Sequence, residues 1–125
     1  MKQHPRILIV DDNDLMRTLM SNILKKLIGS SDLKQASNLT DAFTILGQDS
    51  FDLLLLDINM PQGDSSPETV ALIKEMQPDM KVCMFSGNDK SILAQSFLDA
   101  GAIGFIQKDN TMGSSAAEIV KMVFG

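Results

Sequence analysis

The stretch "RILIVDDNDL", residues 6–15, decides the fold. Its apolar run, residues 7–10, ends in the adjacent carboxylates Asp11 and Asp12, and a third acid follows at Asp14. Four apolar residues bounded by charged ones are typical of a strand that is buried on both faces. Because burying neighbouring like charges is costly unless something pairs with them, we expect the end of this strand to have partners elsewhere in the chain.

Similar apolar runs recur along the chain. They lie at residues 53–56, 82–85 and 103–106, with a weaker one at 33–36. Segments with helical spacing of apolar residues separate them, at 15–28, 40–46, 67–76, 90–99 and 114–124. Five strands alternating with five helices predict an α/β fold in which helices cover both faces of a parallel sheet.

Polar residues and glycine mark the predicted helix ends. Asp14 is suited to cap the helix 15–28, and Gly29 is suited to stop it. Pro67 is favourable at a first helical position, and Asp89 can cap the helix that begins after it.

Composition bounds the class of protein. The chain has 125 residues, of which 44% are hydrophobic and 22% charged, and this balance predicts one globular unit. Cys83 is the only cysteine, and no apolar run approaches the length of a membrane span, so we expect a soluble, cytoplasmic protein without membrane contact. A net charge of −5 argues against direct contact with nucleic acid.

Polar side chains follow four of the predicted strands. Asp11 and Asp12 follow the first run, Asp57 follows 53–56, Ser86 follows 82–85, and Lys108 comes shortly after 103–106. The carboxyl ends of parallel strands meet at one edge, where ligands of such sheets bind. Three clustered carboxylates need a cation, and Mg²⁺ prefers oxygen ligands. A carboxylate beside such a metal can act as a nucleophile toward a phosphoryl group, whose oxygens an ammonium and a hydroxyl can bind.

Four motifs, in this order along the chain, carry a resemblance to a known family. They are "ILIVDDNDLMR" (7–17), "DLLLLDINMP" (52–61), "FSG" (85–87) and "DAGAIGFIQK" (99–108). With them the chain resembles the receiver domain of bacterial two-component response regulators. The resemblance implies a flavodoxin-like (βα)5 fold with strand order 2-1-3-4-5, and a single receiver domain over residues 1–125.

The same resemblance assigns roles to the acids. Asp57 would accept a phosphoryl group in a reaction that needs Mg²⁺. Asp12 would bind the metal directly and Asp11 mainly through a coordinated water. The backbone carbonyl of Asn59 would be a further ligand, and the Asn59 side chain and Asn88 would occupy two variable positions that tune the lifetime of the phosphoryl group.

Other roles concern the switch. Ser86 and Lys108 would follow the phosphoryl group, and Phe105 occupies the position of a switching aromatic residue. A sensor histidine kinase or phosphotransfer protein would supply the phosphoryl group. An output domain, a partner or a second copy would read the surface formed by 90–99, 103–106 and 114–124, most simply to regulate transcription. The only catalysis implied is self-phosphorylation and dephosphorylation.

The chain also departs from the family pattern. Asp109 follows Lys108 where proline is usual, and a Lys-Asp pair resembles the subfamily with a helix-turn-helix DNA-binding output domain. The loop after Asp57 reads "MPQGDSSPE", and Phe105 lacks the hydroxyl of the commoner tyrosine.

Plainer interpretations stay open at this point. Asp14 is best explained as a helix-start acid, Ser86 could cap a turn, Lys108 could be solvated, and Phe105 could belong to the core. A phosphohydrolase would usually carry a second acid where Asn59 stands. A flavin-binding domain would place a phosphate-binding loop, rather than acids, after the first strand. An interaction module that keeps only the fold would not need the acid set.

Overall fold

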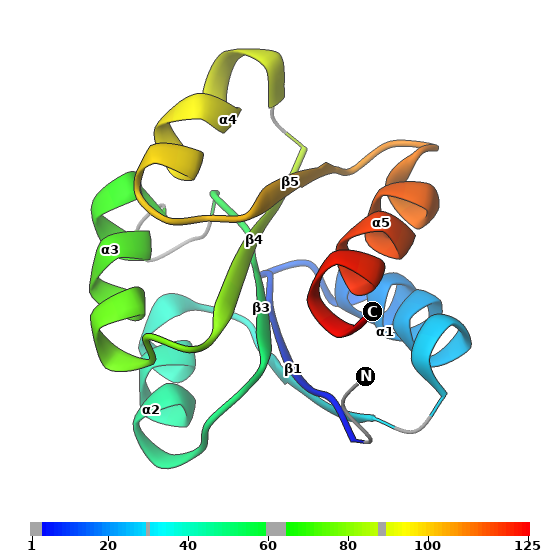
Figure 1. Ribbon diagram of the computed structural model, residues 1–125, viewed down its shortest axis with the longest axis horizontal. Coiled ribbons are helices and arrows are strands. Elements are labelled where there is room, and N and C mark those ends of the chain that lie inside the picture. Colours follow the sequence, from blue (N-terminus) through cyan, green and yellow to red (C-terminus); the bar gives the residue numbers. More distant parts are fainter. Residues whose placement is uncertain (1–3, 30, 60–64, 88–89) are drawn as a thin grey trace.

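Five parallel strands form one sheet in the order β2-β1-β3-β4-β5, the order that was predicted (Figure 1). The computed structural model describes residues 4–29, 31–59, 65–87 and 90–125. The strands are β1 (Arg6–Val10), β2 (Asp32–Ala36), β3 (Leu53–Leu56), β4 (Lys81–Ser86) and β5 (Gly104–Gln107). The helices are α1 (Asp14–Ile28), α2 (Leu39–Gln48), α3 (Pro67–Met76), α4 (Lys90–Asp99) and α5 (Met112–Phe124).

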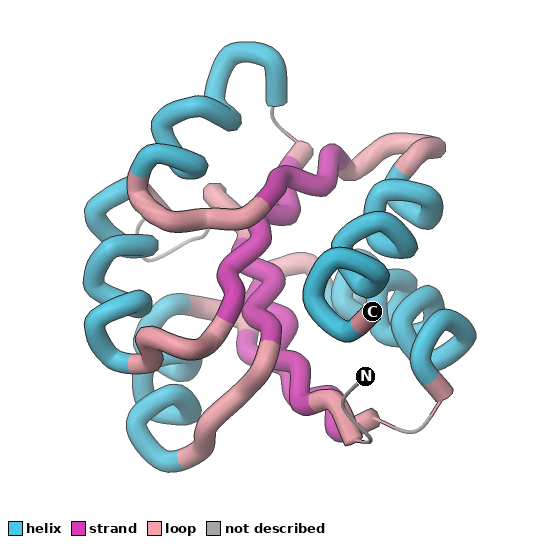
Figure 2. Tube along the Cα trace, in the orientation of Figure 1, coloured by secondary structure: helices cyan, strands magenta, loops and turns pink. Residues whose placement is uncertain are grey.

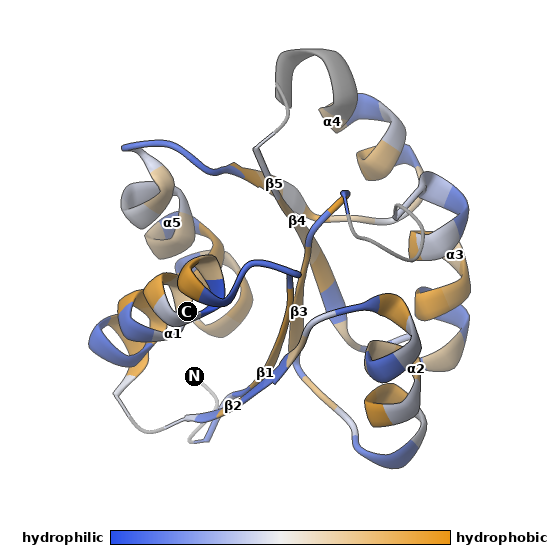
Figure 3. Ribbon diagram, turned by 180° about the vertical axis from the view of Figure 1, so that it is seen from behind, coloured by the Kyte–Doolittle hydropathy of each residue, from blue (hydrophilic) through white to orange (hydrophobic). Residues whose placement is uncertain are grey.

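The sheet lies between two helical layers (Figures 1 and 2). Helices α2, α3 and α4 cover one face, and α1 and α5 cover the other. Alternate strand residues face the two layers, because successive side chains of a strand point in opposite directions. Leu8, Leu54 and Val82 pack toward α2–α4, whereas Ile7, Leu53 and Cys83 pack toward α1 and α5. In Figure 3 the central strands β1 and β3 are coloured mainly as hydrophobic, whereas the edge strand β2 is mainly hydrophilic.

Helix ends agree with the sequence in most places and correct it in one. The N-cap of α1 is Asn13 rather than Asp14: its backbone is extended and its side chain accepts a hydrogen bond from the Met16 N–H at 3.0 Å. Asp14 is instead the first helical residue, where the positive end of the helix dipole favours a carboxylate. Gly29 ends α1 with a φ of 79°, and Pro67 occupies the first turn of α3 behind the cap residue Ser66.

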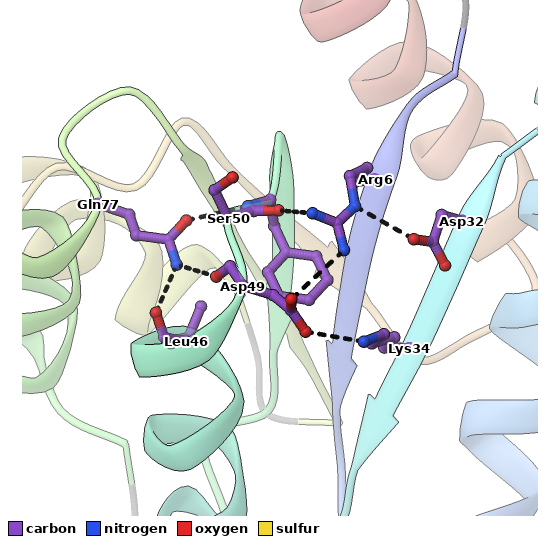
Figure 4. A network of polar contacts seen from close by, with 8 residues as sticks. Arg6, Asp32, Lys34, Leu46, Asp49, Ser50 and Gln77 are labelled. Atoms are coloured by element: carbon purple, nitrogen blue, oxygen red, sulfur yellow. Dashed lines mark hydrogen bonds and ion pairs between the residues drawn. The ribbon is translucent and has the colours of Figure 1, made fainter.

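An arginine joins the starts of three strands at the amino edge of the sheet (Figure 4). Arg6 begins β1 and donates from Nε to Asp32 on β2 at 3.1 Å and from Nη1 to the Ser50 carbonyl before β3 at 2.8 Å. Its guanidinium also lies 5.1 Å from the centre of the Phe51 ring. The contacts hold the strand starts together without involving the opposite edge.

A glutamine ties α2 and α3 to the same edge (Figure 4). The Gln77 amide donates to the carbonyls of Leu46 and Asp49 at 2.9 and 2.8 Å, and its oxygen accepts from the Phe51 N–H at 3.0 Å. The Asp49 carboxylate binds Lys34 of β2 at 2.8 Å, and the hydrogen bond and charge of Lys34 lower the pKa of Asp49. Within the described residues, no helix is long and apolar enough to cross a membrane.

Candidate metal centre

The ends of β1, β3, β4 and β5 meet at the carboxyl edge of the sheet. Backbone hydrogen bonds continue the strand ladders one residue further: the Asp11 N–H donates to the Ala36 carbonyl at 3.1 Å and the Asp57 N–H to the Val10 carbonyl at 2.9 Å. The Lys108 N–H donates to the Ser86 carbonyl at 2.8 Å. The residues at the strand ends are therefore placed by the sheet itself rather than by flexible loops.

Three carboxylates converge there. Asp11, Asp12 and Asp57 each offer an oxygen, and these oxygens lie within 4.8 Å of one another. Asp11 is completely buried and Asp57 is 3% exposed, whereas Asp12 faces solvent. The buried Asp11 Oδ2 has an ion pair with Lys108 but accepts no well-directed hydrogen bond in the described part of the chain. A hard divalent cation suits this set of oxygens, with water completing its coordination from the open side.

Lys108 lies against the buried acids and is not a solvated surface lysine. Its Nζ is 2.6 Å from Asp11 Oδ2 and 3.4 Å from Asp57 Oδ2, and its side chain is 15% exposed. The same ammonium lies 5.0 Å from the centre of the ring of Phe85, which is fully buried. One cation thus bridges two acids and rests on an aromatic face that stabilises positive charge.

The pKa of Asp57 is raised to about 6. Burial of the carboxylate is the main cause and the charge of Asp11 is the next, while the charge of Lys108 acts in the opposite direction. Asp57 is therefore mostly ionised at neutral pH, in surroundings that disfavour its charge. An ionised, weakly stabilised carboxylate is suited to form a bond to an electrophile.

Comparison with known proteins assigns the family. A family model described as "Response regulator receiver domain" matches residues 7–122. The chain belongs to this family. The receiver domain is 30% identical over 121 residues to a glycerol metabolism activator of Pseudomonas putida, which covers 96% of this chain and 54% of the relative. It is 28% identical over 118 residues to the response regulator GacA of Pseudomonas aeruginosa, covering 94% of this chain and 53% of that protein.

A solved structure agrees in fold. The receiver domain superimposes on a response regulator from Thermotoga maritima with a TM-score of 0.82 at 28% identity, over 96% of this chain and 97% of that one. The chain spans about half of the length of the sequence relatives named above.

The other predicted residues of the receiver domain lie around the three acids or on the strands that lead to them. Ser86 is the last residue of β4 and is fully buried. Phe105 is partly buried on β5 and packs on the α2–α4 side, and Asn59 is exposed two residues after Asp57. Residues 60–64, Asn88 and Asp89 lie outside the described residues, so the predictions made for that loop, the lifetime position and the cap stay predictions.

Two further features concern the cysteine of β4 and the peptide bond after Lys108. Cys83 is buried in mid-strand, and burial raises the pKa of its thiol to about 12, which agrees with an inert packing role. No cis peptide bond occurs among the described residues, so the bond between Lys108 and Asp109 is trans.

Sequence reasoning missed two residues that contact this site. Phe85 was seen only as the end of the apolar run 82–85 and as part of "FSG", although an aromatic residue directly before Ser86 was the available signal. Arg17 was seen only as the last letter of "ILIVDDNDLMR"; in the structure its side chain reaches the Asp11 carbonyl.

Proposed function

We propose that residues 1–125 form a receiver domain that acts as a phosphorylation-dependent switch, with Asp57 as the phosphoacceptor. One observation carries the proposal: the buried Asp57 carboxylate lies with those of Asp11 and Asp12 within 4.8 Å, and Lys108 contacts both buried acids. A nucleophile, a cation-binding acid set and an ammonium for phosphoryl oxygens are the parts that phosphoryl transfer to a carboxylate requires.

We further propose Mg²⁺ as the metal. Asp12 and Asp57 would bind it directly, Asp11 through water, and the backbone carbonyl of Asn59 would complete the protein ligands. Oxygen donors alone, with one open side, suit Mg²⁺ better than softer metals. The bound ion would offset the charge of the carboxylates and of the incoming phosphoryl oxygens.

The transfer step assigns each group a role. An Asp57 carboxylate oxygen forms the new bond to phosphorus, while the bond from phosphorus to the imidazole nitrogen of a donor histidine breaks. The electron pair of that bond stays on the imidazole, which takes up a proton. Lys108 then binds a phosphoryl oxygen in place of Asp57 Oδ2, and the Ser86 hydroxyl donates to another. A sensor histidine kinase or phosphotransfer protein is the donor that this chemistry requires.

The signal would leave through α4, β5 and α5. Lys108 follows β5, and Ser86 ends β4, the strand that precedes α4 along the chain, so both proposed phosphoryl contacts belong to this side of the fold. Phe105 on β5 is only partly buried, and we propose that it turns inward when Ser86 moves to the phosphoryl group. Exposed apolar side chains on α4 and α5, Leu98 and Met122, belong to the surface that would change.

We propose transcription as the regulated process. The named relatives are an activator and a response regulator about twice as long as the matched segment, and the Lys-Asp pair at 108–109 agrees with a DNA-binding output domain. With a net charge of −5, the receiver domain itself would leave DNA contact to that domain. A second phosphorylated copy is another possible reader of the surface.

The test is phosphorylation with acetyl phosphate and Mg²⁺, followed by intact-mass measurement. We expect one labile phosphoryl group on the native chain and on Asp79→Ala, which removes an exposed acid just before the start of β4, at the opposite end of that strand from Ser86. Asp57→Ala should take up none. Absence of addition to the native chain, or unchanged addition to Asp57→Ala, would contradict the proposal. Sustained hydrolysis of simple phosphate esters would instead favour a phosphohydrolase.

A further inference from the structure

Arg17 of α1 contacts both β2 and the segment of residues 11–14 that carries the acids. It lies in the first half of α1, and its side chain is only 13% exposed. Nη1 donates to the backbone carbonyl of Asp11, Nη2 contacts the Asp14 carboxylate, and Nε donates to the Gln35 side chain on β2 at 3.0 Å. The guanidinium thus joins three separate parts of the chain, which its fixed fork of donors makes possible.

The contact with Asp11 acts on the acids through their shared backbone. The Asp11 carbonyl belongs to the peptide that joins Asp11 to Asp12. On the other side of Asp11, its N–H donates to the Ala36 carbonyl of β2 at 3.1 Å. One residue therefore has its N–H and C=O fixed in different directions, so the angle at which the two acids leave β1 is set by β2 and Arg17 together.

Arg17 is itself held by a second contact. The Gln35 amide that binds it through oxygen donates from nitrogen to Ser21 Oγ at 3.1 Å, and Ser21 is a buried residue of α1. Ser21 thus holds the Gln35 amide, and the Gln35 amide in turn orients the Arg17 guanidinium. A side chain whose supporting contacts are satisfied holds its partner more precisely than a mobile one.

The charge of Arg17 is placed where it does not compete with a metal. Asp11, Asp12 and Asp14 place three negative charges within four residues. Within the described residues, the contacts of the Arg17 guanidinium are with the Asp11 carbonyl, the Asp14 carboxylate and Gln35, and not with the carboxylates of Asp11 and Asp12. Lys108, by contrast, occupies carboxylate oxygens of Asp11 and Asp57 directly. The two cations have different roles: Lys108 contacts the reacting groups, and Arg17 supports the loop that carries them.

We propose that Arg17 is a positioning residue that fixes the Asp11–Asp12 peptide for binding of a divalent cation. The inference rests on the proposed function, because it takes Asp11 and Asp12 as the metal-binding acids. It adds a residue that touches neither the metal nor the phosphoryl group, and it names the peptide through which that residue acts.

The experiment is a Mg²⁺ titration of the purified chain followed by ¹⁵N NMR, which reports the Kd and the folded state in the same spectra. Arg17→Met keeps the length of the apolar stem and removes the donors, and it should raise the Kd roughly tenfold or more. Arg17→Lys keeps the positive charge without the three-way fork, so it should resemble Arg17→Met. Gln35→Leu, which removes only the support, should raise the Kd by a smaller factor.

The matched control is Arg6→Met. Arg6 also makes several side-chain contacts, but these lie at the amino edge of the sheet. Arg6→Met should therefore lose stability and keep the native Kd for Mg²⁺. A native Kd in Arg17→Met, or full recovery in Arg17→Lys, would overturn the inference, since the second result would mean that charge alone matters. If Arg17→Met does not fold, Arg17→Lys and Gln35→Leu decide: native Kd values in both overturn it.

Failure of the proposed function has a different signature. If the native chain neither binds Mg²⁺ nor accepts a phosphoryl group, both proposals fall together. If the native chain does both and the Arg17 variants bind Mg²⁺ equally well, only the role of Arg17 falls.

Discussion

The buried carboxylate of Asp57 lowers the stability of the fold, although the proposed reaction needs it. Because burial and the charge of Asp11 raise its pKa from 3.8 to about 6, the folded chain holds an ionised carboxylate at neutral pH at a cost in stability. Lys108 offsets part of that cost, since its ammonium lies 3.4 Å from Asp57 Oδ2. The remainder is free energy that a bound cation or a covalently attached group can relieve.

Replacing the charge should therefore stabilise the metal-free fold. Asp57→Asn should raise the free energy of unfolding at pH 7, in EDTA, by roughly 1–2 kcal/mol. Between pH 6 and about 4 the native Asp57 takes up a proton while the unfolded chain stays ionised, so the gain should shrink over this range and vanish below it. Urea unfolding of both chains at several pH values measures it. A variant less stable than the native chain at pH 7 would mean that the ion pair with Lys108 outweighs the burial cost.

The acids of the loop after β1 should differ in their effect on metal binding. Asp12→Ala removes a proposed ligand and should weaken Mg²⁺ binding at least roughly tenfold, the lower end of what supporting residues alone contribute. Asp14→Ala removes a neighbouring acid of equal charge that is exposed at the start of α1 and is not among the three converging carboxylates, so it should raise the Kd much less than Asp12→Ala does. Calorimetric titration compares them. Equal losses in the two variants would point to a diffuse electrostatic effect rather than to a ligand.

At the scale of elements, α5 packs on β5 through a position that has no room for a side chain. A Cβ on Gly104 would lie 2.7 Å from Ile119 Cδ1 and 3.8 Å from Cys83 Sγ, and Ile119 and Cys83 are both buried. The missing side chain of Gly104 thus lets Ile119 of α5 pack directly against the backbone of the edge strand β5.

Gly104→Ala should cost about 1–3 kcal/mol in the free energy of unfolding, because Ile119 must move within a packed layer. Gly47→Ala is the matched control: it lies in α2 with nothing within 4 Å of its added Cβ, and higher helix propensity should make it neutral to stabilising. Thermal and urea unfolding of the two variants test the contrast. A Gly104→Ala chain as stable as the native one would show that the layer adjusts at little cost.

The sequence predicted elements better than it predicted contacts between them. Apolar runs and helical spacing located all ten elements to within a few residues, because burial imposes a period on each segment. The N-cap of α1 was placed at Asp14 instead of Asn13, since both types cap helices and only backbone conformation separates them. Strand-end chemistry brought together Asp11, Asp12 and Asp57 because parallel strands end at one edge.

Contacts that cross between elements could not be predicted in this way. The partner of Arg17 on β2, Gln35, depends on the register of β1 with β2, which leaves no mark in the local pattern. The ring of Phe85 under Lys108 depends likewise on how β4 and β5 align. Both contacts hold residues of the site, so the parts that sequence reasoning missed are those that orient the chemistry rather than those that perform it.

At the scale of the whole molecule, the candidate site has closer connections to some helices than to others. Lys108 joins Asp57 to the segment after β5, and Ser86 ends β4 just before α4. Helix α2 instead packs on the β2 side, and its C-terminal end is held by Gln77 at the amino edge, away from the acids. Through Lys108 and Ser86, a change at Asp57 therefore has short structural routes to β5, α4 and α5, whereas its link to the α2 side runs through the backbone hydrogen bond between Asp11 and Ala36.

This asymmetry predicts which elements change their amide hydrogen exchange when Asp57 is phosphorylated. Amide hydrogen exchange with acetyl phosphate and Mg²⁺ should change in α4, β5 and the start of α5, while α2 and β2 exchange as before. Phe105→Ala should still accept the phosphoryl group by intact mass, because Phe105 touches neither Asp57 nor Lys108 in the described contacts. It should nevertheless lose most of the exchange change in α4, if the inward turn of Phe105 is what couples β5 to that helix.

Lys108→Met should lose both the phosphoryl addition and the exchange change, since the ammonium that it removes contacts the acids directly. If the change in amide exchange survives in Phe105→Ala, the coupling to α4 runs through Ser86 and β4 rather than through Phe105. If α2 shows a change as large as that in α4, the whole domain responds to phosphorylation, and not only the side that contains Lys108 and Ser86.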